Sequence, residues 1–170
     1  MSSADTLLPD TEEVAEEYGR PVGELRGYTS VMAVYAVGVS LAAYAMKRAG
    51  RLPSDIAPRD LALVALATHK LSRTVSKDAV TSPFRAPFAR FEGPAGPGEV
   101  HEEVAGTGAR KAVGELMTCP FCLDQWIATG FVTGLAVAPR LTRYVAGIFA
   151  VRAGADLLQF GYSAADAATR

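Results

Sequence analysis

Residues 28–46 have the sequence YTSVMAVYAVGVSLAAYAM, a run of 19 residues without a charged side chain. A helix rises about 1.5 Å per residue, so this run is long enough to cross the roughly 30 Å of hydrocarbon in a bilayer. Basic residues follow it at Lys47, Arg48 and Arg51, a typical stop to membrane transfer. The pattern predicts a transmembrane helix over residues 28–48, with a buried helix of a soluble protein as the alternative.

Polar and apolar residues are segregated along the 170-residue chain. Its composition is 49% hydrophobic, although residues 1–26 and 92–111 are polar, so the remainder is far more apolar than the mean. The 17 basic and 18 acidic residues nearly cancel, which argues against a nucleic-acid partner because no strong positive field would attract phosphates. We therefore predict an all-α fold, a small polytopic membrane bundle of three to four transmembrane helices.

The predicted organisation is a tail followed by one membrane domain. Residues 1–26 are acidic, lack the pattern of a signal peptide, and are predicted to be mostly disordered apart from a short helix over residues 11–18. Residues 27–170 form the membrane domain. Its helices are predicted at residues 28–48, 58–77, 120–138 and 141–162, with a flexible linker rich in glycine and proline at residues 92–109.

The second predicted helix carries a basic face. His69, Arg73 and Lys77 recur every four residues and so share one side of the helix. This face indicates contact with anionic headgroups or a polar pocket, with a solvated helix end as the remaining alternative. Residues 81–92, TSPFRAPFARFE, then interleave phenylalanine with arginine, including Arg85. They predict an interfacial loop between the second and third helices, or a loop packed on the bundle.

The only two cysteines lie in the sequence ELMTCPFCLDQW, residues 115–126. Pro120 favours the first turn of a helix, which makes Cys119 the N-cap and places Cys122 about one turn further on. The N-terminal end of a helix favours a thiolate over a thiol, so the pair is suited to metal binding or to redox exchange.

Zinc is the candidate cofactor of this cysteine pair. It prefers four ligands, of which Cys119 and Cys122 supply two. His69, His101 or the same cysteines of a second copy of the chain would have to supply the others, and the last case implies a homodimer.

The last two predicted helices carry signals of packing and of charge. Gly130 and Gly134 form a G-x-x-x-G pair, which allows another helix backbone to approach closely. In the final helix Arg152 and Asp156 interrupt an apolar run, and their i, i+4 spacing predicts that they pair with each other and face the interior. That pair is structural, or it handles protons or substrate. The loop charges predict that both termini are cytoplasmic.

Two blocks, HKLSRTVSKDAVTSPFR at residues 69–85 and GELMTCPFCLDQW at residues 114–126, carry a resemblance. Together they resemble the bacterial membrane-protein family known as domain of unknown function 1360, over about residues 60–162. The matching positions are Arg73, Asp78, Pro83, Arg85, Gly114, Leu116, Cys119, Cys122 and Trp126. At Asp124 the chain departs from the small residue of the family pattern. The resemblance implies a membrane location and a common fold, and it supplies no activity.

Three functions are compatible with these features. We predict a non-catalytic, multi-pass protein of the bacterial cytoplasmic membrane, in which Cys119 and Cys122 form a structural or metal-binding site at the mouth of a helix. A membrane thiol-disulfide oxidoreductase is the first alternative, although it would lack the second cysteine pair that relays electrons. The second alternative is an accessory subunit of a larger transport or lipid-handling complex, with a polar interior lined by His69, Arg73, Arg152 and Asp156.

Overall fold

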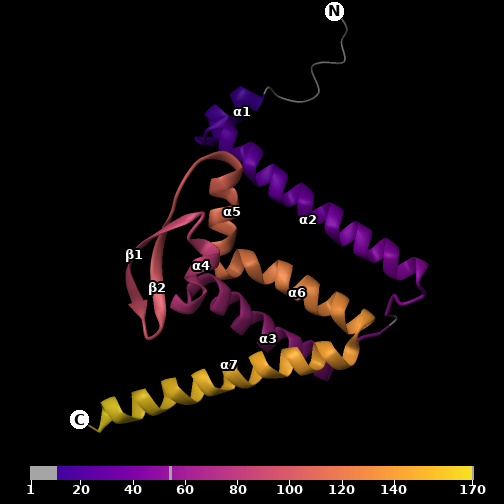
Figure 1. Ribbon diagram of the computed structural model, residues 1–170, viewed down its shortest axis with the longest axis vertical. Helices are drawn as coiled ribbons and strands as arrows, with labels where there is room; N and C mark the ends of the chain where they lie inside the picture. Colours follow the sequence, from indigo (N-terminus) through magenta and orange to yellow (C-terminus); the bar gives the residue numbers. More distant parts are fainter. Residues whose placement is uncertain (1–10, 54, 170) are drawn as a thin grey trace, which may run out of the picture.

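The computed structural model describes residues 11–53 and 55–169, and Figure 1 shows the arrangement of their helices and strands. Residues 1–10 of the predicted tail lie outside the described residues. The elements, in chain order, are α1 (Thr11–Tyr18), α2 (Val22–Arg48), α3 (Pro58–Lys77), the 3-10 turn η1 (Ala79–Thr81), α4 (Ser82–Arg85), β1 (Ala89–Gly96), β2 (Glu99–Val104), α5 (Gly108–Thr118), α6 (Pro120–Val137) and α7 (Pro139–Ala168).

The prediction of an all-α bundle with three to four membrane spans is wrong. Within residues 11–53 and 55–169, α2 alone is long and apolar enough to cross a membrane, and a two-stranded antiparallel sheet interrupts the series of helices. Charged side chains recur along α3 and α7, and α6 has only 18 residues with Asp124 in its second turn. The apolar runs in α3, α6 and α7 are therefore too short, or contain too many charged residues, to cross a membrane.

The segment predicted as a flexible linker, residues 92–109, is largely a β-hairpin. Strand β1 pairs antiparallel with β2 from Ala89 opposite Val104 to Gly96 opposite Glu99, with two irregularities in the register. Gly98 closes the turn with φ +77°, a left-handed conformation that glycine adopts without strain. The glycines and prolines of this segment thus mark a tight turn and an irregular register.

Helix α3 lies between α6 and α7 and carries the centre of the hydrophobic core (Figure 1). Ala67 of α3 and Ala146 of α7 are both 0% exposed, so the two helices meet through small side chains. Val64 and Phe131 complete the buried cluster. Its apolar rim consists of Leu63, Leu71, Ile127, Leu135, Val145 and Phe149. This packing holds the polar C-terminal half of α3 in a fixed place between its neighbours.

The two glycines of the predicted G-x-x-x-G pair differ in their surroundings. A Cβ atom at Gly134 would lie 2.6 Å from Oγ1 of Thr142, so α6 needs glycine there to pass the first turns of α7. A Cβ atom at Gly130 would meet nothing within 4 Å. The close approach therefore belongs to the sharp turn between α6 and α7, and Gly130 takes no part in it.

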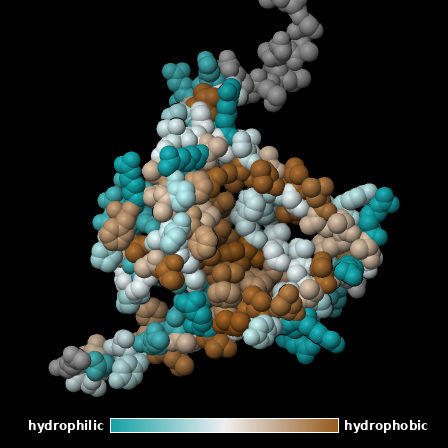
Figure 2. Space-filling model, in the orientation of Figure 1, coloured by the Kyte–Doolittle hydropathy of each residue, from teal (hydrophilic) through white to brown (hydrophobic). Residues whose placement is uncertain are grey.

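Helix α2 is joined to the rest of the chain mainly through α5. At Gly27 a Cβ atom would lie 2.6 Å from the carbonyl oxygen of Gly108, so the two backbones touch. The ammonium group of Lys111 forms an ion pair with Glu24 at 2.7 Å, which raises the pKa of the lysine. Further along, α2 meets α6 where the rings of Tyr35 and Trp126 pack edge to face, 5.0 Å apart. Most of the apolar surface of α2 stays exposed, as the brown side chains along it in Figure 2 show.

Candidate functional site

Arg85, the last residue of α4, is the centre of a buried polar network. Its side chain is 0% exposed. Nε and Nη2 donate to the carboxylate of Glu102 on β2 at 2.5 and 3.2 Å, while Nη1 donates to the Val75 carbonyl and to the Thr81 hydroxyl at 2.6 Å each. Nη2 also donates to the carbonyl of Asp78 at 3.0 Å. One guanidinium group therefore joins the end of α3, the turn η1 and the hairpin.

Further ion pairs surround α3 and link it to the hairpin and to α7. They are Arg73 with Glu99 at 2.7 Å, Lys70 with Asp156 at 2.5 Å, Arg152 with Asp78 at 3.5 Å, and Arg143 with Asp60 at 2.7 Å. The last of these pairs, a two-pronged hydrogen bond at the start of both helices, lowers the pKa of the Asp60 carboxyl. Each charged side chain in these four pairs is thus balanced by an opposite charge on a neighbouring segment.

The predicted pairing of Arg152 with Asp156 is wrong. Arg152 lies beside Asp78 and also donates to the Thr74 hydroxyl at 3.3 Å, whereas Asp156 pairs with Lys70. Because α7 runs along α3, its charged side chains meet opposite charges on that helix, and these contacts replace the pairing along one helix face.

The structure brings together most of the predicted polar residues. Arg73, Asp78, Arg85, Arg152 and Asp156 all belong to the ion pairs around the C-terminal half of α3 and the hairpin. The buried position of Arg85 excludes the headgroup contact that was one of its two predicted roles. Sequence reasoning missed Lys70, Glu99 and Glu102, which are the partners of these groups. The only sequence feature that marks these three residues as partners is that their charge is opposite to that of the predicted residues.

The cysteines lie where Pro120 places them. Cys119 is the N-cap of α6, and its sulfur accepts a hydrogen bond from the backbone N–H of Cys122 at 3.2 Å. The residue Cys122 is exposed, but the chain removes part of the water from around its sulfur, and this raises the pKa of the thiol to about 11, helped by the hydrogen bond and charge of Cys119 and by the carboxylates of Asp124 and Glu115. These effects outweigh the helix N-terminus, so the expected thiolate is not favoured at Cys122.

No group of three or more histidine, cysteine, aspartate or glutamate side chains could hold a metal ion within residues 11–53 and 55–169. Neither His69 nor His101 therefore joins the two cysteines in such a group. A zinc ion bound by Cys119 and Cys122 would therefore need ligands from outside the described part of the chain, for example from a second copy of it.

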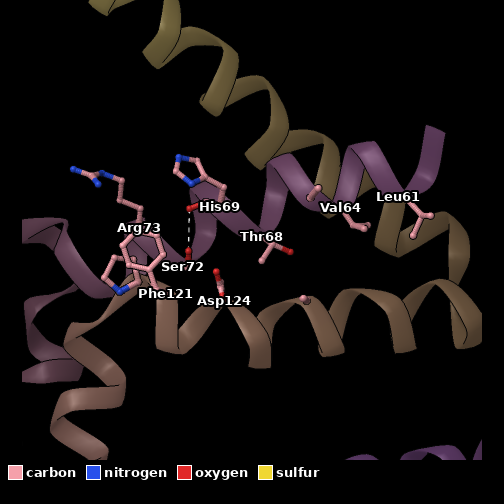
Figure 3. A pocket seen from close by; sticks show the side chains of 11 residues that line it. Leu61, Val64, Thr68, His69, Ser72, Arg73, Phe121 and Asp124 are labelled. Carbon is pink, nitrogen blue, oxygen red and sulfur yellow. Dashed lines mark hydrogen bonds between the residues drawn. The ribbon is translucent and has the colours of Figure 1, made fainter. Parts of the chain in front are cut away.

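A cavity of about 570 Å³ lies between α3 and the first half of α6 (Figure 3). One part of its wall is apolar, with Leu61 and Val64. The other part carries polar side chains, with His69 and Arg73, which the sequence placed on one helix face, and Asp124. The cysteines do not line it, although Pro120 and Phe121 between them do. Thr68 also lines this cavity, and its hydroxyl is buried without a hydrogen-bond partner.

The part of the chain that holds these motifs matches a known protein family. The family described as "Protein of unknown function (DUF1360)" matches residues 63–162, more than half of the chain. This chain is a member of the DUF1360 family. It is also similar to "Sporulation protein YjcA" of Bacillus subtilis (strain 168), at 28% identity over 102 residues that cover 58% of this chain and 86% of YjcA. No solved structure matches.

The resemblance predicted from the two sequence blocks is therefore confirmed. The DUF1360 match begins in α3 and ends in α7, so it contains the Arg85 network, the cysteine pair and nearly all of the cavity wall. Helices α1 and α2 lie outside it. The polar network thus belongs to the part of the chain that the DUF1360 family shares, and the most apolar helix does not.

Replacing Arg85 with alanine is expected to lower the free energy of unfolding by about 3–5 kcal/mol, because Glu102 is left charged and buried without its partner. Chemical unfolding of the purified chain measures this change. Arg90→Ala is the matched control, since Arg90 is exposed on β1 and its loss should alter stability by less than about 0.5 kcal/mol. Equal stabilities for the two variants would contradict the central place of Arg85.

The Cys122 thiol is expected to react slowly with iodoacetamide at pH 8. A pKa of about 11 in place of 9.0 leaves about a hundredfold less thiolate, and the higher intrinsic reactivity of that thiolate recovers only part of the loss, so the rate falls roughly tenfold. Mass spectrometry of the Cys122 peptide, in the folded chain and in urea, gives both rates. The folded rate should still be rising above pH 10, and equal folded and unfolded rates at pH 8 would rule out the raised pKa.

Proposed function

We propose that this DUF1360 protein is a non-catalytic protein of the bacterial cytoplasmic membrane, with α2 embedded in lipid and the α3 to α7 body acting as a binding scaffold. The observation that carries the proposal is the exposure of α2. None of its most apolar 18-residue stretch is buried inside the chain. The side chains of Met32, Val34, Val37, Leu41 and Tyr44 are each more than half exposed.

Such a surface is unfavourable in water. Contiguous apolar patches of this kind mark contact with a membrane or a partner, and the uncharged run of residues 28–46 has the length that a bilayer requires. The basic residues at its C-terminal end, Lys47, Arg48 and Arg51, suit the boundary with headgroups. Lipid around α2 accounts for both the apolar run and the charges that end it.

The state of the reactive groups favours a scaffold over an enzyme. Arg73, Arg85 and Arg152 are held in ion pairs, and such pairing satisfies charges that catalysis would need to be available. The chain also has only two cysteines, so no second pair could pass electrons onward.

Lysine at two exposed positions of α2 should release the protein from membranes. In the double variant Val37→Lys and Leu41→Lys each lysine costs roughly 2.5–3.5 kcal/mol of insertion free energy near the centre of a membrane helix. We expect most of the variant to leave the membrane pellet in an alkaline carbonate wash, while wild type stays. The control, Leu52→Lys with Val80→Lys, changes exposed apolar residues outside α2 and should stay bound. Recovery of wild type from a detergent-free lysate as a uniform monomer would refute the proposal.

A role in sporulation is a second, process-level candidate. It rests on the similarity to the protein named sporulation protein YjcA, which extends over 86% of that protein. The DUF1360 match covers residues 63–162, which lie in the body of the chain and exclude α2. The body is therefore the part that would carry the shared role.

Expression of this chain in Bacillus subtilis lacking YjcA tests the sporulation role. We expect the number of heat-resistant spores to rise towards the level that YjcA itself restores from the same promoter. The Arg85→Ala variant should restore fewer spores, because it loosens the hairpin from α3. A stable, abundant wild-type chain that restores no spores would contradict a shared role.

A further inference from the structure

We propose that the cavity between α3 and α6 binds a primary alkylammonium group, with its ammonium at Asp124 and Thr68 and its alkyl arm along Leu61, Val64 and Ala65. This site goes beyond the membrane location proposed above and does not depend on it. Three features of the cavity favour such a ligand, namely an unpaired carboxylate, a buried hydroxyl without a partner and an apolar wall.

The first feature is the free negative charge. In Figure 3 the side chain of Asp124 points from α6 towards α3, into the space between the two helices. Among the described residues its carboxylate accepts no hydrogen bond and forms no ion pair. Arg73, the permanent cation of the cavity wall, is already bound by both carboxylate oxygens of Glu99 at 2.7 and 2.8 Å. The uncompensated charge facing the cavity is therefore negative, which favours a cation.

The second feature is Thr68. This residue is only 9% exposed, and its hydroxyl oxygen has no hydrogen-bond partner, which is unfavourable for a buried polar group. Figure 3 shows its side chain in the space between α3 and α6, on the side of α3 that Asp124 faces. The oxygen is almost inaccessible in this rotamer, so the side chain must turn about its Cα–Cβ bond towards the cavity before the hydroxyl can accept a hydrogen bond from a ligand with several N–H groups.

The number of acceptors matches a primary ammonium group, which has three N–H donors and no acceptor. The two carboxylate oxygens of Asp124 and the hydroxyl oxygen of Thr68 supply three acceptors. A quaternary ammonium has no N–H group and would leave the Thr68 hydroxyl unpaired, so it should bind less well.

The third feature is the apolar wall. Leu61, Val64 and Ala65 of α3 face Ala128 of α6 along the rest of the cavity. Its volume of about 570 Å³ falls within the range of sites that hold small organic molecules. The ligand therefore combines a primary amine with a hydrocarbon arm, which could come from an amino-headgroup lipid or from a soluble alkylamine.

Equilibrium dialysis of radiolabelled hexylamine against the full chain in phosphatidylcholine nanodiscs tests the site, with empty nanodiscs as background. We expect saturable binding of one molecule per chain, and weaker binding of hexyltrimethylammonium and of hexanol. Asp124→Asn should weaken hexylamine binding by roughly tenfold to a hundredfold, because a charge-assisted hydrogen bond is lost. The control Asp55→Asn removes an exposed carboxylate outside the cavity and should bind as wild type does.

Thr68→Val separates a binding role from a packing defect, and it keeps the test decisive if Asp124→Asn fails to fold. We expect the variant to be at least as stable as wild type without ligand, since an unpaired buried hydroxyl is removed, and to bind hexylamine several-fold more weakly. Unchanged affinity in Thr68→Val, or in a folded Asp124→Asn, overturns the proposal, as does binding to wild type that does not saturate.

Competition identifies the source of the amine. Displacement of hexylamine by phosphatidylethanolamine in the nanodisc supports a lipid ligand, and displacement by 1,4-diaminobutane from solution supports a soluble amine. Displacement by neither, together with unchanged binding in Asp124→Asn, counts against the site. If wild type leaves the membrane but hexylamine still binds through Asp124, the proposed membrane location fails and the cavity stands.

Discussion

The guanidinium group of Arg85 is the constraint on which the arrangement of this protein depends. A charged group that is removed from water must be surrounded by hydrogen-bond acceptors, and Arg85 finds them on α3, on η1 and on β2. The hairpin is therefore more than a connection between helices, because without Glu102 the arginine would be buried and unpaired. The same requirement fixes the end of α3 and the turn that follows it, where the carbonyl groups of Val75 and Asp78 accept hydrogen bonds from the guanidinium.

Local features of the chain were predictable, and long-range ones were not. Pro58 and Pro120 start α3 and α6, and the N-cap role of Cys119 follows from Pro120 alone. The hairpin was missed because glycine and proline suggest flexibility as readily as a tight turn. Arg85 was placed correctly only as one of two alternatives, since a charged residue usually lies at the surface. Sequence gives no measure of burial for it.

The charge pairs show the same limit. The spacing of Arg152 and Asp156 is a local pattern, but their partners Asp78 and Lys70 lie 74 and 86 residues earlier in the chain. Asp124 shows the opposite case. Its charge was visible in the sequence as a departure from the family pattern, and only the position of α3 relative to α6 gave it a cavity to face. The membrane spans were overpredicted because apolar content was weighed without the paired charges.

The contact between Gly27 and Gly108 couples the orientation of α2 to the position of α5. Two backbones in direct contact leave no side chain to absorb a movement, so a change in the tilt of α2 must carry the start of α5 with it. Helix α5 ends at Thr118 and α6 begins at Pro120, with Cys119 as the cap residue between them, so the displacement continues to Pro120 in the cavity wall. Bilayer thickness, which sets the tilt of an embedded helix, would in this way be mechanically connected to the width of an opening formed by entirely different residues.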